Sequence, residues 1–386
     1  MMAQHDNRSM LPDQALTLLA GLAPAQFMRR HWHKKPLLVR QAIPGIAAPL
    51  SRAELFVLAA RDDVESRLVQ RDSQDRWCLR QGPVPRRSLP PLSRPGWTLL
   101  VQGLDLHLDA AHELLARFRF VPEARLDDLM LSYASDGGGV GPHTDSYDVF
   151  LLQVQGRRRW RIAPARHPVW RDDVPLKMLA RFTAEQDWLL EPGDMLYLPP
   201  GWAHDGVAVD GDCMTASIGF RAPGADELAR ALLARLADDV EPDGRGARYR
   251  DPAQPATHTP GLVPATLRQF AGEVVSRMLR DPVALERVLG EWVTEPKAQV
   301  WFEAPRGSAA ALGQGVVLDR RSRMAYDAHY VFINGESCRA SGRDARLMQT
   351  LADRRRLDAR SVGAASSAAR ALLDEWLASG WLHAQT

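Results

Sequence analysis

Between residues 97 and 222 the sequence consists of short apolar runs separated by Gly, Pro and Asp residues that favour turns. Runs of this length and spacing are typical of all-β sandwiches and barrels, so we expect one of these folds here. A helical insertion fits around Ala110–Phe118. The runs that predict strands are Trp97–Gln102, Leu129–Tyr133, Val149–Val154, Arg159–Ile162, Met195–Leu198 and Thr215–Phe220.

The segments on either side of this region follow other patterns. Residues 1–90 mix short helical patterns with loops and contain a strand-like run at Leu37–Val39. After residue 223 two apolar stripes recur at helical spacing, separated by a Pro/Gly-rich linker at about 241–264. Stripes of this kind usually pack in the core of the same chain. Because few strands are predicted near them, packing against a partner chain is the second interpretation. The stripes contain Leu228, Leu232, Leu233 and Leu236, then Leu267, Phe270, Ala271, Val274 and Met278.

From about residue 300 the pattern predicts a mixed domain. Strands are expected at Val316–Leu318 and Tyr330–Ile333, together with two helices. We therefore predict three regions: a β-rich domain with an N-terminal helical and strand extension at 1–223, a helical region at 224–299, and an α+β domain at 300–386.

Composition narrows the class of protein. With 386 residues, 45% of them apolar and 25% charged, the chain is expected to be soluble and to bury a large core. A formal net charge of only +2 argues against a bulk nucleic-acid binder. The three cysteines are far apart, which argues against a zinc ribbon or a disulfide framework and favours the cytoplasm. Neither a membrane span nor an apolar signal segment in MMAQHDNRSM is expected.

Two segments of the β region carry a candidate metal site. The first reads GGGVGPHTD and ends with His143, Thr144 and Asp145; the second reads GDMLYLPPGWAH and ends at His204. Residues two apart in a strand point to the same face, so His143 and Asp145 can both point into a barrel. Two histidines and one carboxylate leave three positions of an octahedron open, as in non-haem iron(II) oxygenases.

A single His-x-Asp tripeptide is weak evidence, because a solvated or core histidine is the more common explanation. The combination is stronger. The second segment fits the second motif of cupin barrels, and the first places Gly137 as the first cupin motif does, with Asp145 where many cupins have histidine. Both motifs lie in the predicted β region in the expected order, which favours a metal site.

A basic run, Arg157-Arg-Arg-Arg-Trp-Arg161, follows the first motif. Most charge clusters are solvated edges. Strand alternation, however, groups Arg158 with Trp160 and Ile162, which predicts that Arg158 points into the barrel. A buried guanidinium needs an anion, and the far carboxylate of a metal-chelating dicarboxylate such as 2-oxoglutarate would provide one.

The runs GGGVGPHTDSYDVFLLQVQGRRRWRI, EPGDMLYLPPGWAH and TASIGFRAP resemble the JmjC-type bacterial ribosomal oxygenases, and FMRRHWHKKPLLVR is similar to that family's opening. The resemblance implies a double-stranded β-helix (cupin/JmjC) barrel, then a helical dimerisation region and a winged-helix-like C-terminal α+β domain. It also implies a homodimer that uses Fe(2+), 2-oxoglutarate and O2 to hydroxylate an arginine of a large-subunit ribosomal protein.

Residue by residue, the resemblance implies that His143, Asp145 and His204 bind the iron. Arg158 would hold the C5 carboxylate of 2-oxoglutarate, and Ser132 would provide a hydroxyl contact to the same co-substrate. Ser217 is implied as a substrate contact.

Asp128 is our candidate partner for a substrate guanidinium, because it shares a strand face with Ser132 and a buried cation must be neutralised. An exposed turn acid beside Asp127 is the competing interpretation of this residue.

Other functions remain open at this point. A metal cupin acting on a small molecule would not need Arg158, and a protein demethylase could use the same barrel. A purely structural metal site is disfavoured, because such sites are usually closed by protein ligands. The small excess of arginine over acid after residue 301 leaves RNA binding by the C-terminal domain undecided.

Overall fold

The computed structural model describes residues 11–239, 248–256, 258–304 and 315–385. The N-terminal stretch MMAQHDNRSM and part of the predicted linker at 241–264 lie outside the described residues. The chain divides into two compact units. The first contains Met1–Ala222, Lys297–Glu303 and Asp319–Arg321, and the second contains Pro223–Pro296, Ala304–Leu318 and Ser322–Thr386.

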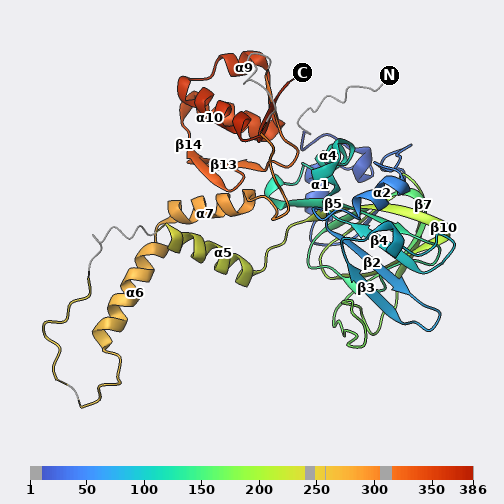
Figure 1. The fold of residues 1–386 in the computed structure, drawn as a ribbon, viewed down its shortest axis with the longest axis horizontal. Helices are drawn as coiled ribbons and strands as arrows, with labels where there is room; N and C mark the ends of the chain where they lie inside the picture. The colour runs from blue at the N-terminus through green and yellow to red at the C-terminus, as the bar shows by residue number, and fades with distance from the viewer. Residues whose placement is uncertain (1–10, 240–247, 257, 305–314, 386) are drawn as a thin grey trace. The chain divides into compact units, whose positions relative to one another are not determined.

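The first unit is built on an antiparallel sheet, as the spacing of apolar runs predicts. Its described residues contribute ten strands, with the order β1-β9-β7-β10-β5-β4-β2-β3; β6 pairs with β10 and β8 with β7 (Figure 1). The strands are β1 (Leu37–Val39), β2 (Ser66–Arg71), β3 (Trp77–Gln81), β4 (Trp97–Val101), β5 (Leu126–Ala134), β6 (His143–Thr144), β7 (Val149–Pro164), β8 (Gln186–Leu190), β9 (Met195–Leu198) and β10 (Trp202–Phe220).

The longest pairing joins β7 and β10, from Trp202 opposite Pro164 to Gly219 opposite Val149. The sequence predicts two separate strands within β7, but the structure has one strand that passes through Gly156. Gly156 has φ +63°, and a Cβ there would lie 2.2 Å from the Asp212 carbonyl oxygen. Glycine therefore allows the two strands to approach closely where their register shifts.

Two apolar clusters occupy opposite faces of the sheet. Phe150 and Leu152 of β7 belong to the large cluster that also contains Phe27 of α1 and Phe118. Leu151, on the other face of β7, belongs to a smaller cluster with Trp160 and Ile162. The helices of this unit are α1 (Pro24–Arg30), α2 (Arg52–Leu58), α3 (Leu104–His107) and α4 (Asp109–Ala116).

Strands β2 and β3 lie in a segment where the sequence predicts helical patterns and loops, so that prediction is wrong there. The reason is the polar character of these strands. Leu68 is fully buried in the large cluster, whereas its neighbours Ser66 and Arg67 are polar and β3 is mostly exposed. A strand with so few apolar residues gives little periodic signal.

The second unit has two parts along the sequence. Helices α5 (Ala225–Asp238), α6 (Ala265–Leu279) and α7 (Pro282–Thr294) come first. In the described C-terminal residues, two three-stranded sheets combine with α8 (Gly342–Arg354), the short α9 (Ala359–Gly363) and α10 (Ser367–Ala378), one helix more than predicted. The strands are β11 (Val316–Leu318), β12 (Met324–Tyr326), β13 (Tyr330–Ile333), β14 (Glu336–Arg339), β15 (Arg356–Leu357) and β16 (Leu382–Ala384). Within the described ranges no helix has the length and apolar character needed to cross a membrane.

A buried acid in the first unit makes its stability depend on pH. Asp105 of α3 accepts a hydrogen bond from the Leu129 backbone N–H at 2.8 Å. Burial, and then the nearby charge of Asp128, raises the pKa of Asp105 from 3.8 to about 6. Between these two values the folded chain binds the proton more tightly than the unfolded chain, so raising the pH through this interval lowers stability.

We expect Asp105→Asn to remove this dependence. The amide can still accept the Leu129 hydrogen bond and has no charge to bury. The variant should gain stability over the wild type, by roughly 1–3 kcal/mol, at pH 7 but not at pH 4. Denaturant unfolding of both proteins at the two pH values measures this, and an equal difference at pH 4 and pH 7 would contradict the assignment.

Candidate metal centre

His143, Asp145 and His204 lie together in the first unit. His143 on β6 is directly opposite His204 on β10, and their ring centroids are 4.2 Å apart. One ligand atom from each of the three side chains lies within 4.8 Å of the others. The three residues that the sequence predicts as metal ligands are thus brought together by strand pairing.

The imidazoles are oriented with Nε2 toward Asp145. His143 Nδ1 lies 2.9 Å from the Gly141 carbonyl oxygen, and His204 Nδ1 lies 3.0 Å from that of Trp202. These carbonyls favour the proton on Nδ1, which leaves the Nε2 lone pair for a metal. His204 Nε2 is 3.5 Å and His143 Nε2 4.0 Å from a carboxylate oxygen of Asp145.

Burial, and then the neighbouring His143, lowers the pKa of His204 to about 4. A neutral imidazole is the form that binds metals. Two histidines and one carboxylate on one side of a metal fit iron(II) with open positions, so this donor set suits a catalytic rather than a closed structural site.

Arg158 of β7 is buried, as the alternation along the strand predicts. Its NH1 donates to Ser132 Oγ at 3.0 Å and to Thr215 Oγ1 at 3.1 Å. Its Nε is buried without a hydrogen-bond partner, and no carboxylate of the described residues forms an ion pair with it. Among the described residues this buried guanidinium contacts two hydroxyls and the Trp160 ring but no acid, so it is suited to an anionic ligand.

Asp128, the candidate substrate acid, is only 5% exposed. Its Oδ2 accepts a hydrogen bond from the Gly103 backbone N–H at 3.0 Å and from Lys297 Nζ at 3.2 Å. Burial alone would lower the pKa of Lys297, but Asp128, Asp127 and Asp105 raise it. Ser217, also buried, lies on β10 opposite Met130.

Two residues of this region were missed in the sequence. Thr215 accepts a hydrogen bond from Arg158. This contact follows from the pairing of β10 with β5, which places Thr215 opposite Ser132. Tyr147 follows Asp145 by two residues, and its pKa is raised by burial and then by Asp145 and Asp128. Its place in a loop after the metal motif gave no periodic signal.

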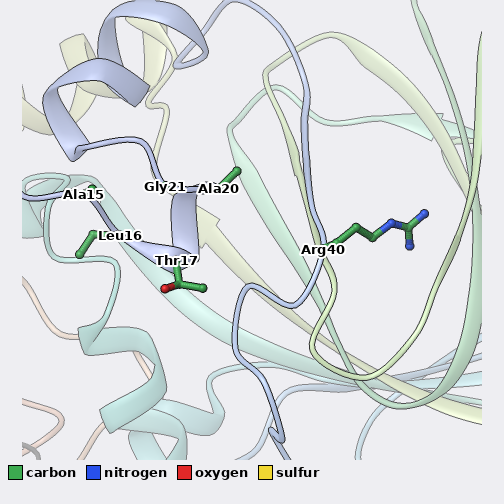
Figure 2. A pocket seen from close by; sticks show the side chains of 6 residues that line it. All are labelled: Ala15, Leu16, Thr17, Ala20, Gly21 and Arg40. Atoms are coloured by element: carbon green, nitrogen blue, oxygen red, sulfur yellow. The ribbon is translucent and has the colours of Figure 1, made fainter.

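A separate hollow lies on the surface near the N-terminal turn at Thr17–Leu19 (Figure 2). The one charged residue of its lining, Arg40, donates to Asp194 Oδ2 at 2.6 Å and to the Leu189 carbonyl oxygen at 2.7 Å. Because that charge is already paired, the hollow is a weaker candidate for chemistry than the His-Asp-His cluster. Its lining consists of Ala15, Leu16, Thr17, Ala20, Gly21 and Arg40.

Comparison with known families assigns this architecture to a class. A JmjC domain model matches residues 113–228, and a ROXA-like winged helix model matches residues 277–383. The β-barrel with its His-Asp-His cluster is therefore that of a JmjC-domain protein of the cupin superfamily, with a winged-helix C-terminal domain. Both of these predicted parts of the fold are confirmed, while the helical dimerisation region stays a prediction.

Individual relatives narrow this class. The ribosomal protein uL16 3-hydroxylase of Escherichia coli K12 is 34% identical over 348 residues, which are 87% of this chain and 90% of the relative. A probable ribosomal oxygenase of Haemophilus influenzae is 37% identical over 54% of this chain and 52% of the relative. The chain belongs to the JmjC-type ribosomal oxygenase family.

Solved structures agree with this assignment. An X-ray structure of E. coli YcfD superimposes with a TM-score of 0.82 at 30% identity, over 94% of this chain and 98% of that one. A complex of YcfD, described as a ribosomal oxygenase, with cobalt and 2-oxoglutarate has a TM-score of 0.79 at 30% identity, over 95% and 99% of the two chains.

We expect His143→Ala and Asp145→Ala each to weaken cobalt(II) binding by more than about a hundredfold, because each removes a direct ligand. Even the loss of a residue that only hydrogen-bonds a ligand typically lowers metal affinity by about 10–100-fold. Calorimetric titration of the metal-free protein measures this. His167→Ala, at an exposed histidine, is the matched control. Near-normal affinity in either ligand variant would show that the metal binds elsewhere.

Proposed function

We propose that this protein is an iron(II)- and 2-oxoglutarate-dependent oxygenase that hydroxylates an arginine side chain of a large-subunit ribosomal protein. The observation that carries the proposal is the His-Asp-His cluster in the same barrel as Arg158, a buried guanidinium that has no acidic partner among the described residues. A ribosomal-protein substrate also fits the expected cytoplasmic location.

In this proposal the chain's own residues hold the reactants. His143, Asp145 and His204 bind the metal through two Nε2 atoms and one carboxylate. Arg158 takes the far carboxylate of 2-oxoglutarate, with Ser132 and Thr215 fixing its guanidinium. When bound, iron(II) and 2-oxoglutarate supply the chemistry that uses O2 to hydroxylate the substrate and release succinate and CO2.

The substrate assignment rests on the name of the E. coli relative, a ribosomal protein uL16 3-hydroxylase, and on two buried polar side chains of β5 and β10. Asp128 is the proposed partner of the entering guanidinium, and Ser217 is a second proposed contact. Because Lys297 already binds Asp128 Oδ2, the substrate cation would have to approach Oδ1 or take the place of Lys297.

Arg158→Ala should raise the 2-oxoglutarate concentration needed for half-maximal turnover by at least about thirtyfold, since truncating one side of a buried charge pair costs about 2 kcal/mol or more. The requirement for a uL16 peptide should change little. Succinate release, measured with and without the peptide, follows both quantities.

Arg157→Ala is the matched control, because Arg157 is exposed and pairs with Asp210 instead. If Arg157→Ala had the larger defect, the inward face of β7 would be assigned wrongly. If the wild type formed no succinate with iron(II), the proposed function itself would fail.

We also propose that the protein is a homodimer through residues 226–290. Helix α6 has no buried residue, and four of its large apolar side chains are exposed in the isolated chain. Leu267, Val274, Val275 and Leu279 are between 37% and 53% exposed. Helix α6 is a 15-residue amphipathic helix whose apolar face is not covered by the rest of the chain. Packing against a second copy of the chain would bury this face.

The double variant Leu267→Glu/Val274→Glu should therefore sediment as a monomer, because it places two charges in the proposed interface. Val57→Glu, at an exposed apolar residue of α2, is the control and should leave the mass unchanged. A double variant that still sediments as a dimer would remove α6 from the interface.

A further inference from the structure

A long connection, residues 165–185, joins β7 to β8. Connections of more than about 12–15 residues are uncommon in compact domains and usually have a function. Part of this connection, residues 169–180, turns back on itself as a hairpin, in which the Arg171 backbone N–H donates to the Met178 carbonyl oxygen at 2.8 Å. We call this part the 169–180 hairpin.

Two apolar side chains of the 169–180 hairpin are buried outside the apolar cores. Met178 is 2% exposed and Leu179 is 5% exposed. Neither belongs to an apolar cluster formed by the described residues. Their burial therefore has to come from another part of the first unit, and the contacts of the hairpin show which part it is.

The 169–180 hairpin contacts the two residues that precede the metal ligand His143. The Leu179 backbone N–H donates to the Pro142 carbonyl oxygen at 2.8 Å. The Met178 side chain packs directly on Gly141, where a Cβ would lie only 2.8 Å from the Met178 sulfur. Gly141 also has φ +77°, so glycine is needed here both for the backbone conformation and for the close approach of the thioether.

His143 depends on such support more than His204 does. His204 lies within the 19-residue strand β10, and its side chain is 3% exposed. His143 begins the two-residue strand β6, which pairs only with β10 among the described strands, and its side chain is 25% exposed. The Gly141 carbonyl oxygen lies 2.9 Å from His143 Nδ1 and orients the ring. A residue that fixes Gly141 therefore fixes the direction of the His143 imidazole.

We propose that Met178 is a positioning residue of the metal centre: packed on Gly141, it holds the carbonyl group that orients the His143 imidazole. The inference rests on the metal site of the proposed function. Loss of a group that hydrogen-bonds a metal ligand typically lowers metal affinity by about 10–100-fold. Met178 acts one step farther out, on the backbone that carries this group, so an effect at the lower end of the range is expected.

The experiment titrates metal-free full-length protein with cobalt(II) by calorimetry and records the visible absorption spectrum of the bound cobalt. Met178→Ala should weaken cobalt(II) binding about tenfold and change the spectrum, because the His143 ring is then held less firmly. Met178→Leu keeps a long apolar side chain of similar volume and should retain the wild-type affinity and spectrum.

Met195→Ala is the matched control. Met195 is also fully buried, but it lies in the large apolar cluster. This variant should lower the unfolding midpoint, as loss of core packing does, and leave both cobalt readouts unchanged.

Wild-type cobalt affinity and spectrum in Met178→Ala would overturn the inference. An equal change in Met195→Ala would also overturn it, because the effect would then be a general loss of packing. If Met178→Ala does not fold, Met178→Val replaces it, with the same expected result. A wild type that binds cobalt but forms no succinate with iron(II) would overturn the proposed function and leave the role of Met178 at the metal intact.

Discussion

The pairing of β7 with β10 is the constraint on which the rest of the first unit depends. It sets Ile162 opposite His204 and Ala208 opposite Arg158, and β10 in turn receives β5 and β6. A slip by one residue would turn every side chain of a strand to the other face. A slip of β7 would turn Arg158 out of the interior, and a slip of β10 would turn His204 out. The register of this one pair therefore matters for a residue in each half of the site.

The arginines on the two faces of β7 have different partners. The three on the outward face of β7 each pair with an aspartate, Arg157 with Asp210, Arg159 with Asp187 and Arg161 with Asp205. The one on the inward face has hydroxyls and a tryptophan ring for neighbours. Since an unpaired buried charge is unfavourable, the inner arrangement is explained by binding rather than by stability.

The metal cluster and the inward direction of Arg158 could be predicted from the sequence, because both follow from spacing within a strand or a short motif. Thr215 could not, since its contact with Arg158 depends on which strands pair and in which register. Tyr147 could not, since it lies in a loop that gives no periodic signal. Strands β2 and β3 were missed for a different reason: β2 has only two apolar residues and β3 is mostly exposed, so apolar alternation is weak. The metal ligands can be predicted from local sequence patterns, whereas the residues that contact Arg158 depend on strand pairing between distant parts of the chain.

Strand alternation predicts which face Asp128 lies on but not which residue binds it. Alternation from Ser132 predicts the face of Asp128, but its partner Lys297 lies 169 residues later in the sequence. Both the Lys297 ammonium and the Gly103 N–H bind Oδ2, and no hydrogen bond from the described residues reaches Oδ1. The Oδ1 side of the carboxylate faces Gly219, where a Cβ would make only an ordinary van der Waals contact at 3.7 Å. Lys297 can therefore hold the carboxylate in place while the second oxygen stays available to a cation.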